Sequence, residues 1–215
     1  MTDVSVAEIY EAVLDYDDEA VPELVNAELE ANTDLRVILD DGMIAALDDI
    51  GARFSEGTLF VPEMLMAAQA VQAGMDILRP LLAETGAKPV GTVVIGTVKG
   101  DLHDIGKNLV GMLLEGAGFQ VVDLGVDIDA ATFINAAQEN EADLVAISGL
   151  LTTSMPEIES AVATIAEANT SRNLNVKVMV GGPPINNDFA TRIGADGYGE
   201  SAPAAVERAR NLVTA

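Results

Sequence analysis

The sequence predicts two kinds of fold in one chain: a bundle of four helices, followed by a doubly wound α/β domain with a five-stranded parallel sheet. Apolar residues recur at helical spacing over residues 1–84. Over residues 85–215, short apolar runs rich in β-branched residues alternate with helical patterns. Strands that are apolar on both faces are typical of a parallel sheet covered by helices. We therefore expect a domain boundary between residues 84 and 85.

The apolar positions of the first half follow the i, i+3, i+4, i+7 spacing of amphipathic helices. They predict helices around residues 6–13, 21–29, 43–54 and 61–78. Pro62 suits the first turn of the fourth helix, and we expect that helix to stop before Pro80. Four such helices suit a small bundle. The stretch LAETGAKP, residues 82–89, is expected to be a linker.

The second half alternates between the two patterns five times. The expected strands are residues 90–98, 119–125, 142–150, 176–182 and 195–199. The expected helices are residues 104–115, 130–138, 156–168, 186–193 and 202–213. This order is typical of a flavodoxin-like or Rossmann-like domain.

Composition excludes several classes of function. The chain has no cysteine and one histidine, so disulfides are impossible and an ordinary zinc site is improbable. Its 35 acidic and 11 basic residues give a formal net charge of -24, which repels phosphate backbones and argues against nucleic-acid binding. An acid-rich, lysine-poor composition is typical of proteins from a salt-rich cytoplasm, but it also occurs in ordinary acidic proteins, and both interpretations stay open.

The beginning of the chain is acidic and lacks the positive and apolar regions of a signal peptide. No run of about 18 apolar residues predicts a membrane-spanning helix. We therefore expect a cytoplasmic protein with no membrane partner.

The single histidine, His103, lies in the stretch VKGDLHDIGKNLVG, residues 98–111. Ligands of doubly wound sheets bind beyond the carboxyl ends of the strands, and the first expected strand ends near Val98. Asp101 could hold one imidazole nitrogen and leave the other as a lone-pair donor. Taken alone, a loop histidine is more often a surface or capping residue, and Asp104 is explained as a helix N-cap.

Two more strand ends add polar groups and bare backbone to the same edge. The third strand runs into SGLLTTS, residues 148–154, and the fourth into VGGPPI, residues 180–185. Each feature is weak evidence by itself. Together with His103 they predict one crevice lined by an imidazole, hydroxyls and glycine backbone.

This combination resembles the cobalamin-binding domains. The matching motifs are Asp101-Leu102-His103-Asp104-Ile105-Gly106, Ser148-Gly149-Leu150 and Gly181-Gly182. The helical half, at GARFSEGTLFVPEMLMAAQAVQAGMDILRPLL, looks like the helical cap of methionine synthase and of the small corrinoid proteins of methanogens and acetogens. The resemblance covers nearly the whole chain and is strongest to the corrinoid proteins of methylamine, methanol and betaine methyltransferase systems.

The resemblance implies a role for each matching residue. His103 matches the lower axial ligand of cobalt, in the base-off, His-on state of the cofactor. Asp101 matches the carboxylate on the other imidazole nitrogen, and Ser154 the hydroxyl that extends this triad. The residues that match the surroundings of the displaced nucleotide tail are Gly106, Ser148, Leu150, Thr152, Gly181 and Gly182. Those that match the apolar cover of the upper corrin face are Phe54, Val61 and Met64, which helical spacing alone assigns to the bundle core.

The resemblance also implies a function. Co(I) would take a methyl group from a donor held by a substrate-specific methyltransferase, and a second methyltransferase would pass it from methyl-Co(III) to a thiol or a tetrahydropterin. A reductive activase is a further expected partner. The chain lacks a barrel-sized substrate domain, so we expect a methyl-carrier subunit and not a complete enzyme. The cofactor would supply the difficult chemistry.

Three alternatives stay open. A cobalamin-dependent regulator or sensor commonly adds a DNA-binding region, for which 215 residues leave no room. The small subunit of a carbon-skeleton mutase shares the histidine motif but usually lacks this cap. A flavodoxin-like module would bind flavin or a nucleotide and would make His103 incidental.

Overall fold

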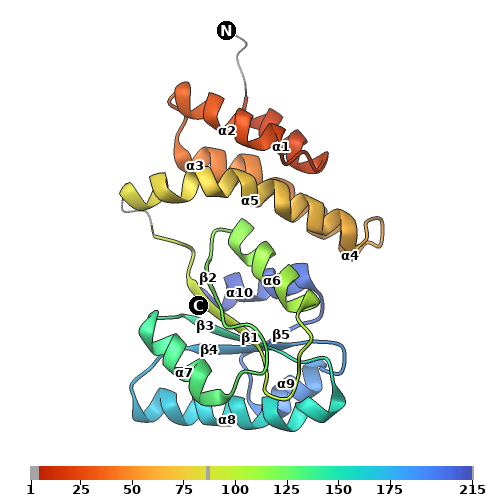
Figure 1. Ribbon diagram of the computed structural model, residues 1–215, viewed down its shortest axis with the longest axis vertical. Helices are drawn as coiled ribbons and strands as arrows, with labels where there is room; N and C mark the ends of the chain where they lie inside the picture. The colour runs from red at the N-terminus through yellow and green to blue at the C-terminus, as the bar shows by residue number, and fades with distance from the viewer. Residues whose placement is uncertain (1–4, 86–87, 215) are drawn as a thin grey trace. The chain divides into compact units, whose positions relative to one another are not determined.

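The computed structural model describes residues 5–85 and 88–214 (Figure 1). Its contacts divide the chain into two compact units. A helical unit comprises Met1–Lys88 with Glu115–Gly118, and a sheet unit comprises Pro89–Leu114 with Phe119–Ala215. The helical half and the five-stranded α/β half confirm the predicted fold class. Residues 86 and 87 of the expected linker lie outside the described residues, and the boundary at 84/85 stays a prediction.

The helical unit contains the four expected helical segments. Its elements are α1 (Val6–Leu14), α2 (Ala20–Glu30), α3 (Leu35–Val37), η1 (Ile38–Ile44), α4 (Ala45–Ser55) and α5 (Val61–Glu84). The elements α3, η1 and α4 follow one another without a break, and η1 is a π-helical stretch. The buried positions keep helical spacing, with Ile9, Val25, Ile50 and Leu78 completely buried. The apolar periodicity therefore predicts the faces that pack together.

Two helical segments are longer than the sequence predicts. The third begins at Leu35 instead of near residue 43. The fourth helix is expected to stop before Pro80, but α5 continues through Pro80 to Glu84, so the first three residues of the expected linker are helical. Proline removes the hydrogen bond that would reach the carbonyl of Asp76. Both residues are exposed, so water can satisfy that carbonyl, and the helix tolerates the proline.

The sheet unit has five parallel strands in the order β2-β1-β3-β4-β5. They are β1 (Thr92–Thr97), β2 (Gln120–Asp123), β3 (Leu144–Ser148), β4 (Lys177–Gly181) and β5 (Gly197–Gly199). All six residues of β1 are buried, whereas the edge strand β2 is partly exposed. This is the flavodoxin-like order, in which later strands are added on the other side of β1, so that the strand order reverses between β1 and β3.

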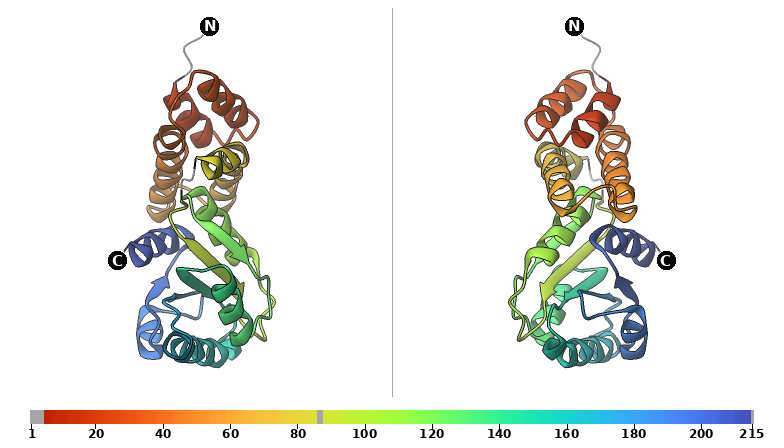
Figure 2. Two further views of the ribbon diagram at one scale, coloured as in Figure 1. Left: turned by 90° about the vertical axis from the view of Figure 1, so that its left-hand side faces the viewer. Right: turned by 90° about the vertical axis from the view of Figure 1, so that its right-hand side faces the viewer.

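Helices cover both faces of this sheet. They are α6 (Ile105–Gly116), α7 (Ala130–Glu139), α8 (Met155–Ser171), α9 (Asn187–Ile193) and α10 (Ala202–Val213), and a 3-10 turn, η2 (Thr152–Ser154), precedes α8. One apolar core joins α7, α8 and α9 to the strands through residues such as Phe133, Ile158 and Phe189. Figures 1 and 2 show these three helices on one face, and α6 and α10 on the other.

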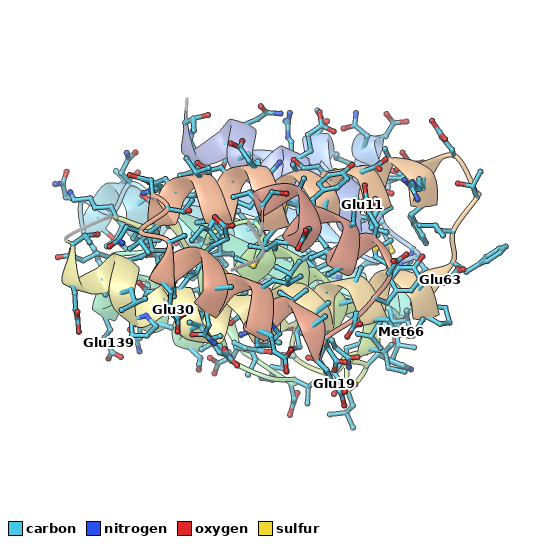
Figure 3. All side chains as sticks on the ribbon, turned by 90° about the horizontal axis from the view of Figure 1, so that it is seen from above. Glu11, Glu19, Glu30, Glu63, Met66 and Glu139 are labelled. Atoms are coloured by element: carbon cyan, nitrogen blue, oxygen red, sulfur yellow. The ribbon has the colours of Figure 1, made fainter. Side chains whose placement is uncertain are left out.

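The surface of the helical unit is strongly acidic. Exposed glutamates lie along its first two helices (Figure 3). Glu11 is on α1, Glu19 comes directly before α2, and Glu30 ends α2. Within residues 5–85 and 88–214, no helix is long and apolar enough to cross a membrane.

Candidate cofactor site

His103 lies where the topology predicts a ligand. It follows β1 and precedes α6, and the carboxyl end of β1 is paired with that of β3, at the point where the strand order reverses. The hydroxyl of Thr97, the last residue of β1, donates to the carbonyl oxygen of His103 at 2.8 Å. The side chain of His103 is 52% exposed. The only imidazole of the chain is therefore held at the mouth of the switch point and is accessible.

Asp101 is completely buried beside it and is the centre of a hydrogen-bond network. Its Oδ1 accepts from the backbone N–H of His103 at 3.1 Å and lies 2.7 Å from Nδ1 of the same residue. Its Oδ2 accepts from the backbone N–H groups of Leu150 at 2.6 Å and Leu151 at 3.1 Å. One carboxylate therefore joins the loop after β1 to the loop after β3.

These contacts fix the charge of Asp101. Burial by itself would raise the pKa of this carboxyl, but the hydrogen bonds from His103, Leu150 and Leu151 outweigh it and hold the pKa well below its usual range. An ionised carboxylate can only accept, so Nδ1 of His103 carries a proton in this contact. In the neutral imidazole, Nε2 then holds a free lone pair, as in histidines that bind metals.

Ser154 completes the arrangement but has two acceptors. Its buried hydroxyl lies 3.2 Å from Oδ2 of Asp101 and 2.7 Å from the carbonyl oxygen of Leu151. A hydroxyl has one proton to donate. The shorter contact is to Leu151, so Ser154 fixes the loop after β3 at least as much as it stabilises the Asp101 carboxylate.

Apolar side chains surround the imidazole and are left exposed. Leu102 and Ile105, on either side of His103 in the chain, are 71% and 81% exposed. Leu150 and Leu151, whose N–H groups bind Asp101, are 41% and 38% exposed. Exposed large apolar side chains around one polar group are typical of a binding surface.

The strand ends beside His103 form a continuous row. Thr97, Ser148, Gly181 and Gly199 pair in register across β1, β3, β4 and β5. Ser148 and Gly181 are half-buried at the carboxyl edge of the sheet. The structure thus brings the predicted Ser148 and Gly181 to one edge with His103.

Gly182 has a packing reason for lacking a side chain. Its φ is +131°, and a Cβ there would lie 1.9 Å from the carbonyl oxygen of Gly149. The turn after β4 therefore passes directly against the turn after β3. By contrast, a Cβ on Gly106 would meet no atom within 4 Å, so the start of α6 has open space beside it.

The remaining predicted residues are placed differently. Thr152 is exposed in η2. Phe54, Val61 and Met64 belong to the helical unit, where Phe54 is half-buried and Val61 is 45% exposed. Met64 is completely buried, as the bundle-core interpretation expects. A role of these three side chains over a corrin ring stays a prediction.

Sequence reasoning missed two polar residues around the histidine loop. Lys107 is 3% exposed, and its Nζ contacts Oδ2 of Asp123 at 2.5 Å. A lysine in the first turn of a helix opposes the helix dipole, and this was the available signal. Asp127 has φ +60° and accepts from the N–H of Gly100 at 2.7 Å, which no sequence pattern indicated.

Comparison with known proteins identifies the family of both units. A family model described as "B12 binding domain" matches residues 91–207, and a second B12 binding domain model matches residues 6–79. The two matches correspond to the sheet and to the helices. The chain therefore has the two domains of a B12-binding protein.

Relatives narrow the class. The chain is 39% identical to trimethylamine corrinoid protein 1 of Methanosarcina mazei over 95% of both chains. A solved cobalamin-binding protein of Desulfitobacterium hafniense has a TM-score of 0.77 at 29% identity and covers 97% of this chain and 98% of its own. One chain of the methanol:cobalamin methyltransferase complex of Methanosarcina barkeri matches this chain with a TM-score of 0.81 at 29% identity. The match covers 100% of this chain and 81% of the chain in the complex. The chain belongs to the B12-binding corrinoid protein family.

The residues at the sheet edge fit the cofactor of this family. A corrinoid brings cobalt in an apolar ring, and the edge offers one accessible imidazole amid exposed Leu102, Ile105, Leu150 and Leu151. The buried carboxylate on Nδ1 leaves Nε2 as the group that can face a metal. The donor set and the apolar surroundings therefore suit a corrinoid.

Proposed function

We propose that this protein carries a methyl group on a corrinoid, between a methyltransferase that takes it from a donor and a second one that passes it to an acceptor. The observation that carries the proposal is the geometry of His103, whose Nδ1 is held by the buried carboxylate of Asp101. The bound cofactor would supply a cobalt centre able to accept and release a methyl group. The chain itself binds, orients and shields that centre.

In this proposal, Nε2 of His103 would bind cobalt in place of the benzimidazole of the cofactor. Asp101 fixes the tautomer and the orientation of the ring through its Nδ1 contact. Because Asp101 also accepts from Leu150 and Leu151, the ligand is tied to both strands at the switch point. Leu102, Ile105 and Leu150 would pack against the underside of the ring.

The displaced tail of the cofactor would lie along the row of strand ends. Ser148 offers a half-buried hydroxyl there, and Gly181 and Gly182 offer backbone without side chains. Thr152 would add an exposed hydroxyl, Leu150 an apolar contact, and Gly106 leaves open space at the start of α6. Phe54 and Val61 of the helical unit, which are partly exposed, would shield the methyl group, and the completely buried Met64 would lie behind them.

The partners follow from the chemistry. One solved relative belongs to a methanol:cobalamin methyltransferase complex, and a relative with higher identity is named a trimethylamine corrinoid protein. We propose a methylated amine as the donor, presented by a substrate-specific methyltransferase. A second methyltransferase would hold the thiol or tetrahydropterin acceptor, and a reductive activase would restore the reduced cofactor.

The first experiment is reconstitution of the purified protein with hydroxocobalamin. We expect tight binding and an absorption spectrum typical of displaced benzimidazole with histidine on cobalt. His103→Ala should lose the histidine-dependent part of that spectrum, because the chain has no other imidazole. Asp104→Asn is the matched control, because Asp104 is the exposed neighbour of His103 and its backbone carbonyl oxygen, which the substitution keeps, accepts from the N–H of Asn108.

Two results would contradict the proposal. One is a protein that stays colourless after reconstitution, and the other is a His103→Ala spectrum identical to that of the unchanged protein. Methyl transfer from a trimethylamine methyltransferase, but not from a methanol enzyme, would support the proposed donor, and the reverse preference would overturn it.

A further inference from the structure

The segment at the end of β2 lies beside the histidine loop, on the other side of β1 from the loop after β3. This segment, residues 123–128, begins with the last residue of the edge strand and contains Gly125 in a left-handed turn. Its backbone is paired with the end of β1, because Thr97 N–H donates to the carbonyl oxygen of Gly125 and Ile128 N–H donates to that of Thr97. It therefore lies directly beside the strand from which the loop starts.

Asp127 makes two contacts to the residues just before His103. Its Oδ1 accepts from the N–H of Gly100 at 2.7 Å, and its own N–H donates to the carbonyl oxygen of Asp101 at 3.1 Å. The side chain and the backbone of one residue thus hold two consecutive residues of the loop. Asp101 is the residue whose carboxylate holds the imidazole, so its backbone position sets the position of His103.

The other end of the segment is tied to the residues just after His103. Nζ of the buried Lys107 contacts Oδ2 of Asp123 at 2.5 Å and Oδ1 of Asn108 at 2.6 Å. Oδ1 of Asp123 in turn accepts from the N–H of Gly125 at 2.8 Å. The segment therefore brackets the loop, with one tie at Gly100 and Asp101 and another at the first turn of α6.

The conformation of Asp127 makes it hard to replace. Its φ of +60° lies in the left-handed region, where aspartate and asparagine are tolerated better than other residues with side chains. In that conformation its carboxylate and its N–H both point to the histidine loop, as the two hydrogen bonds require. A residue in this backbone region without the acceptor would keep the turn and lose the side-chain tie.

We propose that Asp127 is a positioning residue for His103: by fixing Gly100 and Asp101, it sets where the imidazole stands and so how well Nε2 meets a metal. This rests on the proposed role of His103 as the axial ligand. Asp127 acts through the loop alone and needs no contact with the cofactor.

Three substitutions at Asp127 separate the acceptor from the backbone conformation. Asp127→Asn keeps both, because an amide oxygen can accept from Gly100 and asparagine tolerates the left-handed region. Asp127→Gly keeps the conformation and removes the acceptor, and Asp127→Ala loses both. The control is Asp129→Ala in the same stretch, because the Asp129 carboxylate caps α7 by accepting from the N–H and the hydroxyl of Thr132.

The first readout is the spectrum and the affinity of the full chain with hydroxocobalamin. We expect Asp127→Gly to lower the histidine-coordinated fraction and to weaken binding by roughly threefold to tenfold, the effect of one lost hydrogen bond. Asp127→Ala should weaken it further. Asp127→Asn and Asp129→Ala should keep the spectrum of the unchanged protein.

The second readout needs no cofactor. The chain has one histidine, so ¹⁵N-labelled histidine gives the nitrogen NMR signals of one imidazole. In its neutral form, the imidazole of the unchanged apoprotein should carry its proton on Nδ1 and a lone pair on Nε2. Asp127→Gly should broaden these signals or mix the two tautomers, and Asp129→Ala should leave them unchanged.

The outcomes are distinguishable. If Asp127→Gly matches the unchanged protein in both readouts, or if Asp129→Ala alters them equally, the positioning role is overturned. If the unchanged protein has no His103-dependent spectrum, the proposed ligand fails instead, and the NMR experiment still decides whether Asp127 positions the ring.

Discussion

At the scale of single residues, the site depends on a buried carboxylate whose hydrogen-bonding capacity is almost fully used. Asp101 takes two contacts from His103 and two backbone N–H groups from the loop after β3, with the Ser154 hydroxyl nearby. The His103 and backbone partners all donate, so an ionised carboxylate is the group that suits the position. The same residue therefore stabilises the fold and orients the proposed ligand.

Asp101→Asn should destabilise the apoprotein by about 1–3 kcal/mol, because one end of the amide presents N–H groups to donors. The NH₂ group of the asparagine would face either the protonated Nδ1 of His103 or the N–H groups of Leu150 and Leu151. Denaturant unfolding measures the loss. Asp104→Asn, the same change at an exposed neighbour, should alter the free energy of unfolding by less than about 0.5 kcal/mol. Equal effects at the two positions would contradict the stabilising role of Asp101.

Ser154→Ala should cost less, about 0.5–1.5 kcal/mol, because its proton goes mainly to the carbonyl oxygen of Leu151. The cobalamin spectrum should change less than in Asp101→Asn. Thr153→Ala, at the exposed position beside it, is the comparison. A Ser154→Ala spectrum as altered as that of Asp101→Asn would mean that the hydroxyl matters more to the ligand than these distances indicate.

At the scale of elements, periodicity and strand composition predict most helices and strands to within a few residues. The exceptions have physical causes. The expected end of the fourth helix is wrong because an exposed proline near a helix end does little harm, so α5 reaches Glu84. The helical stretch before Met43 is not predicted, and the π-helical form of Ile38–Ile44 has no distinct sequence pattern.

The turns after β3 and β4 offer a test of element packing. Gly182→Ala should destabilise the apoprotein by more than about 2 kcal/mol, since a Cβ would overlap the carbonyl oxygen of Gly149 and the backbone has a positive φ. Gly194→Ala is the matched control, because Gly194 has φ +79° with no atom within 4 Å of a Cβ. It should cost only about 1–2 kcal/mol of backbone strain. Equal losses would show that the close approach at Gly182 is unimportant.

At the scale of the whole molecule, charge is the dominant feature. The formal net charge is -24 over 215 residues, so the acidic side chains repel one another in the compact state. Such repulsion is long-ranged at low ionic strength and is screened within about 3 Å at 1 M salt. The same composition argues against a nucleic-acid partner.

Added salt should therefore stabilise the apoprotein. Between low ionic strength and about 1 M sodium chloride, we expect the thermal unfolding midpoint to rise by roughly 5 °C, equivalent to one or two kcal/mol for a chain of this size. Scanning calorimetry at a series of chloride concentrations measures it. A midpoint that stays constant or falls would show that self-repulsion is not a significant term.

The location of the site is easier to predict from sequence than its supports. Asp101 and His103 could be predicted because they follow a buried strand, and parallel strands end at one edge. Asp127 could not be predicted, because its contact with Gly100 depends on a left-handed backbone conformation 24 residues after His103. The edge strand that precedes it also shows little pattern of its own. Lys107 gives one signal, a lysine in the first turn of an expected helix, but its burial is not visible in periodicity.

Electron paramagnetic resonance can decide whether His103 binds cobalt. The Co(II) form of the bound cofactor shows splitting from the axial nitrogen, and ¹⁵N-histidine labels the ring of one residue only. If His103 is the ligand, the nitrogen triplet of the unlabelled protein becomes a doublet in the labelled one. A triplet that persists would mean that the benzimidazole of the cofactor still occupies cobalt, and would contradict the proposed role of His103.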